Sequence, residues 1–295
     1  MFKLQGVIPP MITPFDEAGD LDVRALEKLV EFLSTRAQGL FICGSYGSGP
    51  MMSVRERKQV AEITQRIVGQ KIPVIVHTGT TNNRDTVELS LHAKSIGCAA
   101  VAAVGPYYFH HSEDTLLAFY SGILKAVGQE FPVYVYNNPK FQGYEFSLST
   151  MTKMKEMGVH GIKDATFDIL TFANYMRLLA SDSFDVALGT ESMWLSARVL
   201  GCEAYIPGIG NVFPELCVKM WREGTNNDFA GCRQTQFLVN RIRNTMYLAR
   251  STQLAVYAMA KIRGIVDAFP RAPFVPASNE EVSAIRQSLE SAGVI

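Results

Sequence analysis

Residues 39–79 read GLFICGSYGSGPMMSVRERKQVAEITQRIVGQKIPVIVHTG and contain one complete strand–helix–strand unit. The runs at 39–44 and 73–79 are short, apolar and bounded by glycine or proline, as strands are. Between them a helical stretch opens with Ser53 and carries Glu56 three positions later, the capping-box pattern of a helix start. Both apolar runs are continuous and not alternating, which is typical of parallel strands buried on both faces.

The same alternation of strand and helix continues along most of the chain. Further apolar runs predict strands at 5–12, 99–105, 132–137, 159–165, 185–190 and 202–208. Helices are predicted over 22–36, 53–68 and 82–96 and, in a purely helical final part, over 215–223, 228–249, 251–268 and 279–292. Eight such units in about 225 residues predict a (β/α)₈ TIM barrel with additional C-terminal helices. A doubly wound open sheet is the rival, less favoured because no domain break interrupts the units.

We therefore expect two parts in one chain. The barrel, which carries the active site, is expected over 1–225, and a helical extension packed on it over 226–295. Because reacting groups of such barrels lie at the C-terminal ends of the strands, the functional residues should come from those ends or from inside the barrel.

Composition excludes several classes of partner. The 295 residues carry 28 Lys+Arg and 28 Asp+Glu, so no global charge attracts nucleic acid or an anionic membrane. The N-terminus lacks a secretory pattern, and no apolar run approaches the length of a membrane helix. The five cysteines are scattered with no CxxC spacing, which favours free thiols in a reducing compartment. We expect a cytoplasmic protein.

Neither a cofactor nor a metal is expected. The loop GSYGSG at 44–49 can bring backbone N–H groups close to a small anion. However, no Lys follows Gly49, as a Walker loop requires, and the dinucleotide fingerprint GxGxxG is absent. The pair His110–His111 precedes Ser112 and two acids, which indicates a helix start, and no HxxH or HExxH spacing occurs.

Lys163 is the unusual residue of the sixth predicted strand. A lysine inside an apolar strand loses hydration, which lowers its pKa and favours the neutral amine that attacks a ketone to form a Schiff base. Two other interpretations remain open on this ground alone: the side chain reaches the rim of the barrel, or it forms a structural ion pair with Asp164. Tyr136 and Tyr108, at other strand ends, could relay protons, although tyrosine is also common there as core with a polar tip.

Four motifs together resemble a known family. CGSYGSG, GPYY (105–108), YNNP (136–139) and GIKDAT (161–166), in this order on the predicted strands, resemble the dihydrodipicolinate synthase / N-acetylneuraminate lyase superfamily, and the likeness covers essentially the whole chain. The resemblance implies a pyruvate-dependent class I aldolase that needs no cofactor and forms a homotetramer.

The resemblance also implies roles for individual residues. Lys163 would form the Schiff base, Tyr136 would donate and accept protons beside it, and Tyr108 would reach into a neighbouring subunit's site. The remaining expected contacts are with the substrate: Ser45, Tyr46 and Gly47 around the pyruvoyl carboxylate, Ile206 near the pyruvate, and Thr166 and Glu191 on hydroxyls of a longer substrate.

Two departures limit the expected activity. Ser48 stands where the family's loop has Glu, and Phe141 stands where the lysine-pathway synthase has the Arg that grips its aldehyde substrate. Phe cannot replace a bidentate guanidinium. We therefore expect an aldolase, lyase or dehydratase that acts on a 2-oxo acid with pyruvate as donor or product, such as a 2-keto-3-deoxy sugar acid aldolase or an N-acetylneuraminate-lyase-like enzyme. The alternatives are 4-hydroxy-tetrahydrodipicolinate synthase and a non-catalytic sensor of 2-oxo acids.

Overall fold

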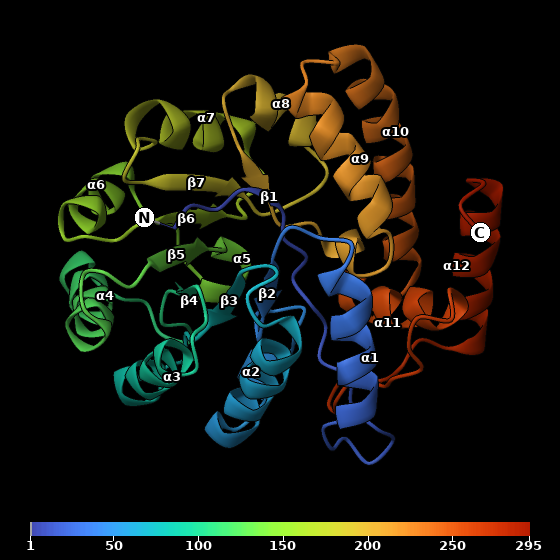
Figure 1. The fold of residues 1–295 in the computed structure, drawn as a ribbon, viewed down its shortest axis with the longest axis horizontal. Helices are drawn as coiled ribbons and strands as arrows, with labels where there is room; N and C mark the ends of the chain where they lie inside the picture. Colours follow the sequence, from blue (N-terminus) through green and yellow to red (C-terminus); the bar gives the residue numbers. More distant parts are fainter. Residues whose placement is uncertain (1) are drawn as a thin grey trace.

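One curled sheet of eight parallel strands forms the centre of the molecule, with helices around it (Figure 1). The computed structural model describes residues 2–295. The strands are β1 (Gly6–Val7), β2 (Leu40–Ile42), β3 (Val74–His77), β4 (Ala100–Val104), β5 (Val133–Asn137), β6 (Gly161–Asp164), β7 (Asp185–Leu188) and β8 (Ala204–Tyr205). Their order in the sheet is β1-β8-β7-β6-β5-β4-β3-β2, so each of the eight predicted strands is confirmed.

The two ends of this order meet just beyond β1. Pro10 forms a parallel bridge with Phe41. The backbone N–H of Met11 donates to the carbonyl of Phe41 at 2.9 Å, and the N–H of Phe41 donates to the carbonyl of Pro9 at 3.0 Å. The sheet thus returns on itself, and the fold is TIM-barrel-like, as predicted.

Helices follow most strands and cover the outside of the sheet (Figure 1). The α-helices are α1 (Val23–Ser34), α2 (Val54–Val68), α3 (Asn83–Ser95), α4 (Glu113–Val127), α5 (Pro139–Gln142), α6 (Leu148–Glu156), α7 (Ile169–Leu178), α8 (Trp194–Val199), α9 (Pro214–Thr225), α10 (Phe229–Thr245), α11 (Thr252–Ile262) and α12 (Asn279–Ser291). Short 3₁₀ helices are η1 (Gly49–Met51), η2 (Gly208–Asn211) and η3 (Met246–Leu248).

Local capping signals position the helix starts as the sequence predicts. The Ser53 side chain accepts the N–H of Glu56 while the Glu56 carboxylate accepts the N–H of Ser53, so the capping box of α2 is complete. Asn82 caps α3, and Ser112 caps α4. The helix start after the two histidines is therefore confirmed.

Two predicted C-terminal helices are too long. The helix expected over 251–268 ends at Ile262, because Gly264 takes φ +66° and the chain beyond it turns back. Phe269 then pairs with Phe15 through two backbone hydrogen bonds, an interaction that no local sequence pattern predicts. The helix expected over 228–249 ends as α10 at Thr245 and continues as the separate turn η3.

Helices α10, α11 and α12 lie together on one side of the barrel (Figure 1). Helix α10 packs along α9 and also contacts α8, and α12 packs on α10 and α11. The boundary expected after residue 225 falls between α9 and α10, and the division into two parts stays a prediction. For the site, the important consequence is that α10 brings side chains to the barrel mouth.

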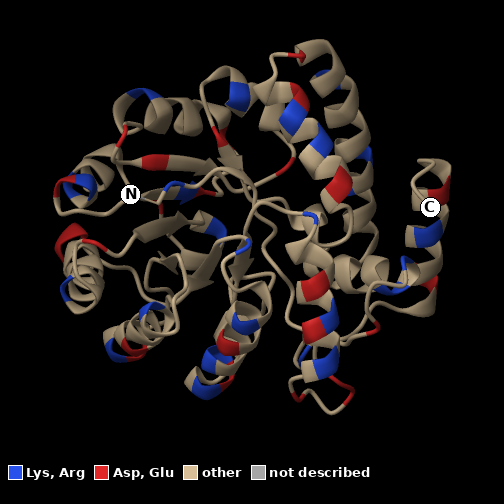
Figure 2. Cartoon of the chain, in the orientation of Figure 1, with Lys and Arg blue, Asp and Glu red and all other residues tan. Residues whose placement is uncertain are grey.

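Apolar side chains form two separate cores. A large one fills the space between the strands and the surrounding helices. A small one lies inside the barrel, where alanines leave room near the strand ends, and includes Ile8, Phe41, Ile75, Val104, Tyr134, Tyr136 and Ile206. Charged residues are concentrated on the outer helices, and the strands carry few (Figure 2). Within residues 2–295 no helix combines the length and apolarity needed to cross a membrane.

Candidate active site

Lys163 points into the barrel from the middle of β6. It pairs in register with Tyr136 on β5 and Ala187 on β7, and only 3% of its surface is exposed. Its ammonium nitrogen lies 3.9 Å from the ring centroids of both Phe41 and Tyr136. Among residues 2–295 no carboxylate lies within ion-pair distance of it. Burial lowers the pKa of Lys163 to about 7, so much of the amine is neutral near neutral pH.

Asp164, the next residue, faces the opposite side of the strand. Its carboxylate accepts the Thr166 hydroxyl at 2.9 Å and lies 3.5 Å from the Asn137 amide nitrogen. Burial raises the pKa of Asp164 to about 7. Because successive strand residues point to opposite faces, Lys163 and Asp164 form no ion pair, and the buried Lys163 does not reach the rim. The two other interpretations of Lys163, a position at the rim of the barrel and an ion pair with Asp164, are therefore wrong.

Tyr136 is held beside Lys163 by two polar neighbours. Its hydroxyl lies 3.1 Å from the Ser45 hydroxyl, and the Asn138 amide donates to it at 2.9 Å. Burial raises the pKa of Tyr136, while its hydrogen bonds to Ser45 and Asn138 oppose that rise. A protonated phenol in contact with a second hydroxyl is an arrangement that can relay protons without a fixed charge.

The glycine-rich loop after β2 leaves three N–H groups unused. Within the loop, the N–H of Gly49 donates to the carbonyl of Gly44 at 3.0 Å and that of Ser48 to the carbonyl of Ser45 at 3.2 Å. The N–H groups of Ser45, Tyr46 and Gly47 meet no acceptor anywhere in the part of the chain that the structure describes. Ser45 and Tyr46 line the same cavity as Lys163. The loop can thus offer donors to a small anion, as predicted for a carboxylate.

Gly49 is required by the shape of this loop. A Cβ atom there would lie 1.8 Å from the carbonyl oxygen of Cys43. We expect Gly49→Ala to lower the free energy of unfolding by about 2 kcal/mol or more, because backbone must move to relieve the clash. We also expect weaker binding of a 2-oxo acid, seen as a higher half-saturation for imine trapping.

The control for this change is Gly69→Ala, at a glycine with φ +58° whose Cβ would meet nothing within 4 Å. It should cost only backbone strain, on the order of 1–3 kcal/mol, and leave half-saturation unchanged. An equal rise in half-saturation in both variants would show that the close approach of Gly49 to Cys43 is unimportant for binding.

His77 contacts the backbone at the start of the glycine-rich loop, and Arg57 contacts His77. The sequence did not predict either residue. The Nδ1 atom of His77 lies 3.1 Å from the Cys43 carbonyl oxygen, and Nε2 accepts the N–H of Val104 at 3.1 Å. These contacts require a neutral ring with its proton on Nδ1; burial, Arg57 and Lys163 together hold the pKa of His77 well below its usual range. Arg57 donates to the carbonyls of His77 (2.6 Å) and Gly79 (3.2 Å).

A cavity of about 410 Å³ joins the expected site residues at the carboxyl ends of the strands. It contains Lys163, Tyr136, Ser45, Tyr46, Glu191, Ile206 and Phe141 among its lining residues. Three expected residues do not line it, and one of them is Gly47 in the glycine-rich loop. Thr166 gives its hydroxyl to Asp164 and does not line this cavity, and Tyr108 is 86% exposed on the loop after β4, with φ +82°.

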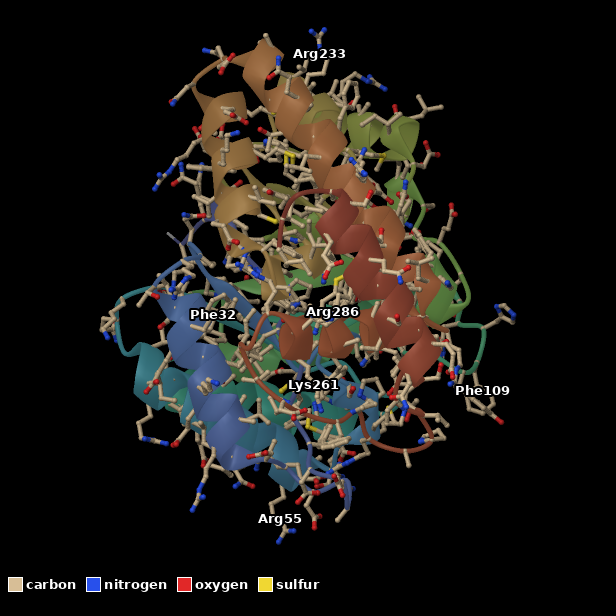
Figure 3. All side chains as sticks on the ribbon, turned by 90° about the vertical axis from the view of Figure 1, so that its right-hand side faces the viewer. Phe32, Arg55, Phe109, Arg233, Lys261 and Arg286 are labelled. Carbon is tan, nitrogen blue, oxygen red and sulfur yellow. The ribbon has the colours of Figure 1, made fainter. Side chains whose placement is uncertain are left out.

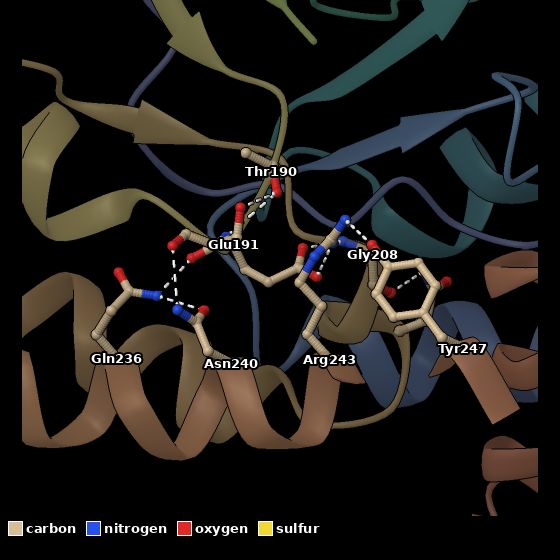
Figure 4. A network of polar contacts seen from close by, with 9 residues as sticks. Thr190, Glu191, Gly208, Gln236, Asn240, Arg243 and Tyr247 are labelled. Carbon is tan, nitrogen blue, oxygen red and sulfur yellow. Dashed lines mark hydrogen bonds and ion pairs between the residues drawn. The ribbon is translucent and has the colours of Figure 1, made fainter. Parts of the chain in front are cut away.

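Glu191 and Arg243 form a buried ion pair in this cavity (Figure 4). A guanidinium nitrogen of Arg243 lies 2.5 Å from one carboxylate oxygen of Glu191, and the other oxygen accepts the N–H of Gly208 at 2.8 Å. The sequence placed Glu191 at the site but not Arg243, which arrives from α10, outside the predicted barrel. Because Arg243 lies 52 residues from Glu191 along the chain, no local sequence pattern predicts this ion pair.

The whole chain matches one family. Residues 3–292 match the dihydrodipicolinate synthetase family. The chain belongs to this family. The resemblance that the four motifs indicated is therefore confirmed, and it extends from the first strand to the last helix.

Relatives within the dihydrodipicolinate synthetase family are distant but full-length. The chain is 28% identical to the 4-hydroxy-tetrahydrodipicolinate synthase of Bartonella quintana (strain Toulouse), over 99% of each protein. Among solved structures, dihydrodipicolinate synthase from Aquifex aeolicus matches with a TM-score of 0.92 at 26% identity, over 99% of each chain.

Two further structures share the fold at 24% identity. Wild-type sialic acid aldolase of Ruminococcus gnavus has a TM-score of 0.93, covering 99% of this chain and 98% of that one. YagE, a prophage protein of the dihydrodipicolinic acid synthase family from E. coli K12 solved in complex with pyruvate, has a TM-score of 0.94 over 99% of each chain. Members of the family are class I aldolases and lyases, and this chain is an enzyme of that class. A non-catalytic sensor is therefore excluded.

Proposed function

We propose that this enzyme forms a Schiff base between Lys163 and a 2-oxo acid, and that it makes or breaks a bond with pyruvate as donor or product. A 2-keto-3-deoxy sugar acid aldolase, a dehydratase or an N-acetylneuraminate-lyase-like enzyme would each use this chemistry. The observation that carries the proposal is the buried amine of Lys163, which has no ion-pair partner among the described residues and stands against the ring of Tyr136.

The proposed reaction begins at the ketone. The Lys163 nitrogen attacks C2 of the 2-oxo acid, and the resulting carbinolamine loses water as Tyr136 supplies a proton to its hydroxyl. The carboxylate would remain in the loop at Ser45 and Tyr46, which fixes C2 relative to the amine.

The protonated imine then withdraws electrons from the C3–C4 bond. When that bond breaks, its electron pair forms an enamine at C2–C3, and the hydroxyl on C4 becomes a carbonyl. Tyr136, left as a phenolate when water departs, would accept this hydroxyl proton, while the Ser45 hydroxyl, 3.1 Å away, donates a hydrogen bond to the phenolate oxygen. Protonation of the enamine and hydrolysis of the imine release pyruvate and free Lys163. Condensation is the same sequence in reverse.

Borohydride reduction in the presence of pyruvate tests this proposal. The expected result is a stable adduct that peptide mass mapping assigns to Lys163. If folded protein gives no adduct with pyruvate or with larger 2-oxo acids, the Schiff-base mechanism is wrong.

The pH dependence of imine formation gives a second test. Because burial lowers the pKa of Lys163 to about 7, about half of the amine should be neutral at pH 7 and nearly all of it above about pH 8. The rate of cyanoborohydride trapping with pyruvate should therefore rise between about pH 6 and 8 and then level off. A rise that begins only above pH 9, as for an exposed lysine, would contradict this environment.

A second candidate is 4-hydroxy-tetrahydrodipicolinate synthase, the activity for which the relative from Bartonella quintana is named. Phe141 argues against it, because this exposed ring at the cavity has no donor for the aldehyde's carboxylate. Efficient condensation of pyruvate with aspartate semialdehyde would establish this second candidate in place of the first.

We also propose that Tyr108 acts in a neighbouring subunit of a homotetramer. Its ring is exposed beside Phe109, which stands out from the surface in Figure 3. A second cavity of about 280 Å³, lined mainly by apolar side chains, lies against Ser45 and Tyr136 and could receive such a ring. Tyr108 would then complete the hydroxyl relay.

Mixed oligomers of two inactive variants test the proposed role of Tyr108. We expect Lys163→Met and Tyr108→Ala to be inactive or nearly so alone, and activity to return partly when the two chains are co-expressed. Recovery is expected because a site that combines Lys163 of one chain with Tyr108 of the other is intact. If mixtures only average the two single activities, Tyr108 does not act across an interface.

Finally, we propose that the enzyme works in a reducing compartment, namely the cytoplasm. All five cysteines are buried free thiols, as the sequence analysis expected.

A further inference from the structure

We propose that the cavity binds a second anionic group, a carboxylate on the part of the substrate remote from the ketone, and that Arg243 receives it. This inference rests on the proposed Schiff-base function and specifies the substrate class of the same site. It concerns a residue on α10 that lies outside the strand ends of the barrel.

Arg243 is positioned at the cavity before any ligand arrives. Its side chain is 12% exposed, and it lines the cavity that contains Lys163. One guanidinium nitrogen contacts Glu191, and the other donates to the Tyr247 hydroxyl at 3.1 Å. These are its two protein acceptors among residues 2–295, so a guanidinium with five N–H groups keeps donors for a ligand (Figure 4).

Both carboxylate oxygens of Glu191 are already engaged within the protein in this arrangement, which makes Glu191 a poor acceptor for a substrate hydroxyl. It is fully buried, and each of its carboxylate oxygens already accepts a hydrogen bond, from Arg243 and from the N–H of Gly208. The wall formed by Glu191 and Arg243 therefore presents positively charged hydrogen-bond donors to the cavity. A ligand group that fits is an acceptor with negative charge.

The surrounding contacts hold this wall rigid. Gln236 and Asn240, two turns and one turn before Arg243 on α10, donate to the backbone carbonyls of Glu191 and Ser192 (Figure 4). The guanidinium also lies 5.3 Å from the ring centroid of Phe167. A planar cation held by an ion pair and aromatic rings loses little freedom when it binds a carboxylate.

The charges lining the cavity leave one cation without an anion. The charged side chains that line it are Lys140, Lys163, Glu191 and Arg243. In the imine, the positive charge on the Lys163 nitrogen balances the pyruvoyl carboxylate. Glu191 balances one of the two remaining cations, so a second carboxylate on the substrate would neutralise the other.

The test compares two isosteric 2-oxo acids, 2-oxoglutarate and 5-methyl-2-oxohexanoate, which differ in the remote carboxylate. The readout is the half-saturation concentration for cyanoborohydride trapping at Lys163, with pyruvate as reference. In the wild-type enzyme we expect half-saturation at least about 10-fold lower for 2-oxoglutarate, since a hydrogen bond to a charged group contributes about 1.5–3 kcal/mol.

Arg243→Gln should abolish that preference while pyruvate is still trapped at Lys163, and Arg243→Lys should restore part of the preference. The double variant Glu191→Gln/Arg243→Gln keeps the wall uncharged, so that loss of preference can be measured without an unpaired buried carboxylate. The matched control is Arg241→Gln on the same helix, whose guanidinium contacts Ser291 away from the cavity.

The outcomes separate this inference from the proposed function. Trapping of pyruvate with no preference between the two longer acids overturns the inference alone, as does a preference that survives in Arg243→Gln. Failure of every 2-oxo acid to trap overturns the Schiff-base function and the inference with it.

Discussion

Lys163→Met is expected to abolish turnover and to leave the fold intact. Removing a covalent nucleophile typically costs on the order of 10⁴-fold or more in rate, and Met fills the same apolar space between Phe41 and Tyr136. The measurements are steady-state turnover, borohydride trapping with pyruvate and thermal unfolding. Residual turnover within about 10-fold of wild type would exclude the Lys163 imine.

The same variant should be more stable than wild type at low pH. Because the folded-state pKa of Lys163 is lowered to about 7, well below the unfolded value of about 10.4, the unfolded chain binds more protons between these values. The destabilisation by Lys163 is therefore fully present below pH 7 and is relieved as pH rises toward 10.

The stability gained by Lys163→Met over wild type should thus be largest below pH 7 and should shrink through pH 7 to 10. Comparing the two proteins at each pH cancels the titration of all other groups. A difference that does not change with pH would mean that Lys163 titrates normally in the folded protein.

Tyr136→Phe is expected to lower turnover by about 10² to 10⁴-fold, the usual contribution of a positioned general acid–base. The ring remains to pack against Lys163, so the loss reports the hydroxyl, with its contacts to Ser45 and Asn138. Trapping with pyruvate should become slower but still reach Lys163, because the nucleophile is unchanged.

Tyr134→Phe is the matched control for this variant. Tyr134 lies on the same strand, faces the same small core and donates its hydroxyl to Asp185 at 2.7 Å. Loss of this hydroxyl should lower the free energy of unfolding by about 1.5–3 kcal/mol without a comparable loss of turnover. If both tyrosine variants lose activity equally, the effect of Tyr136→Phe comes from general disturbance of the core.

Several site residues could be predicted because their signal is local. A charged residue within the apolar run of β6 identified Lys163, and a glycine-rich turn after β2 identified Ser45 and Tyr46. The positions of Thr166 and Tyr108 could not be judged in the same way. The direction of a hydroxyl depends on its neighbours, here Asp164 for Thr166, and the role proposed for the exposed Tyr108 would require another subunit.

The sequence by itself determined the order of strands and helices, the capped starts of α2, α3 and α4, and the position of the buried lysine. Each of these depends on residues a few positions apart, through hydrophobic periodicity and caps. Only the tertiary structure decided how the sheet closes between Pro10 and Phe41, where α11 ends, and which side chains surround the cavity. His77 and Arg57 under the loop, and Arg243 against Glu191, meet across separations of 20 and 52 residues. Such contacts arise from the packing of whole elements, so no local pattern encodes them.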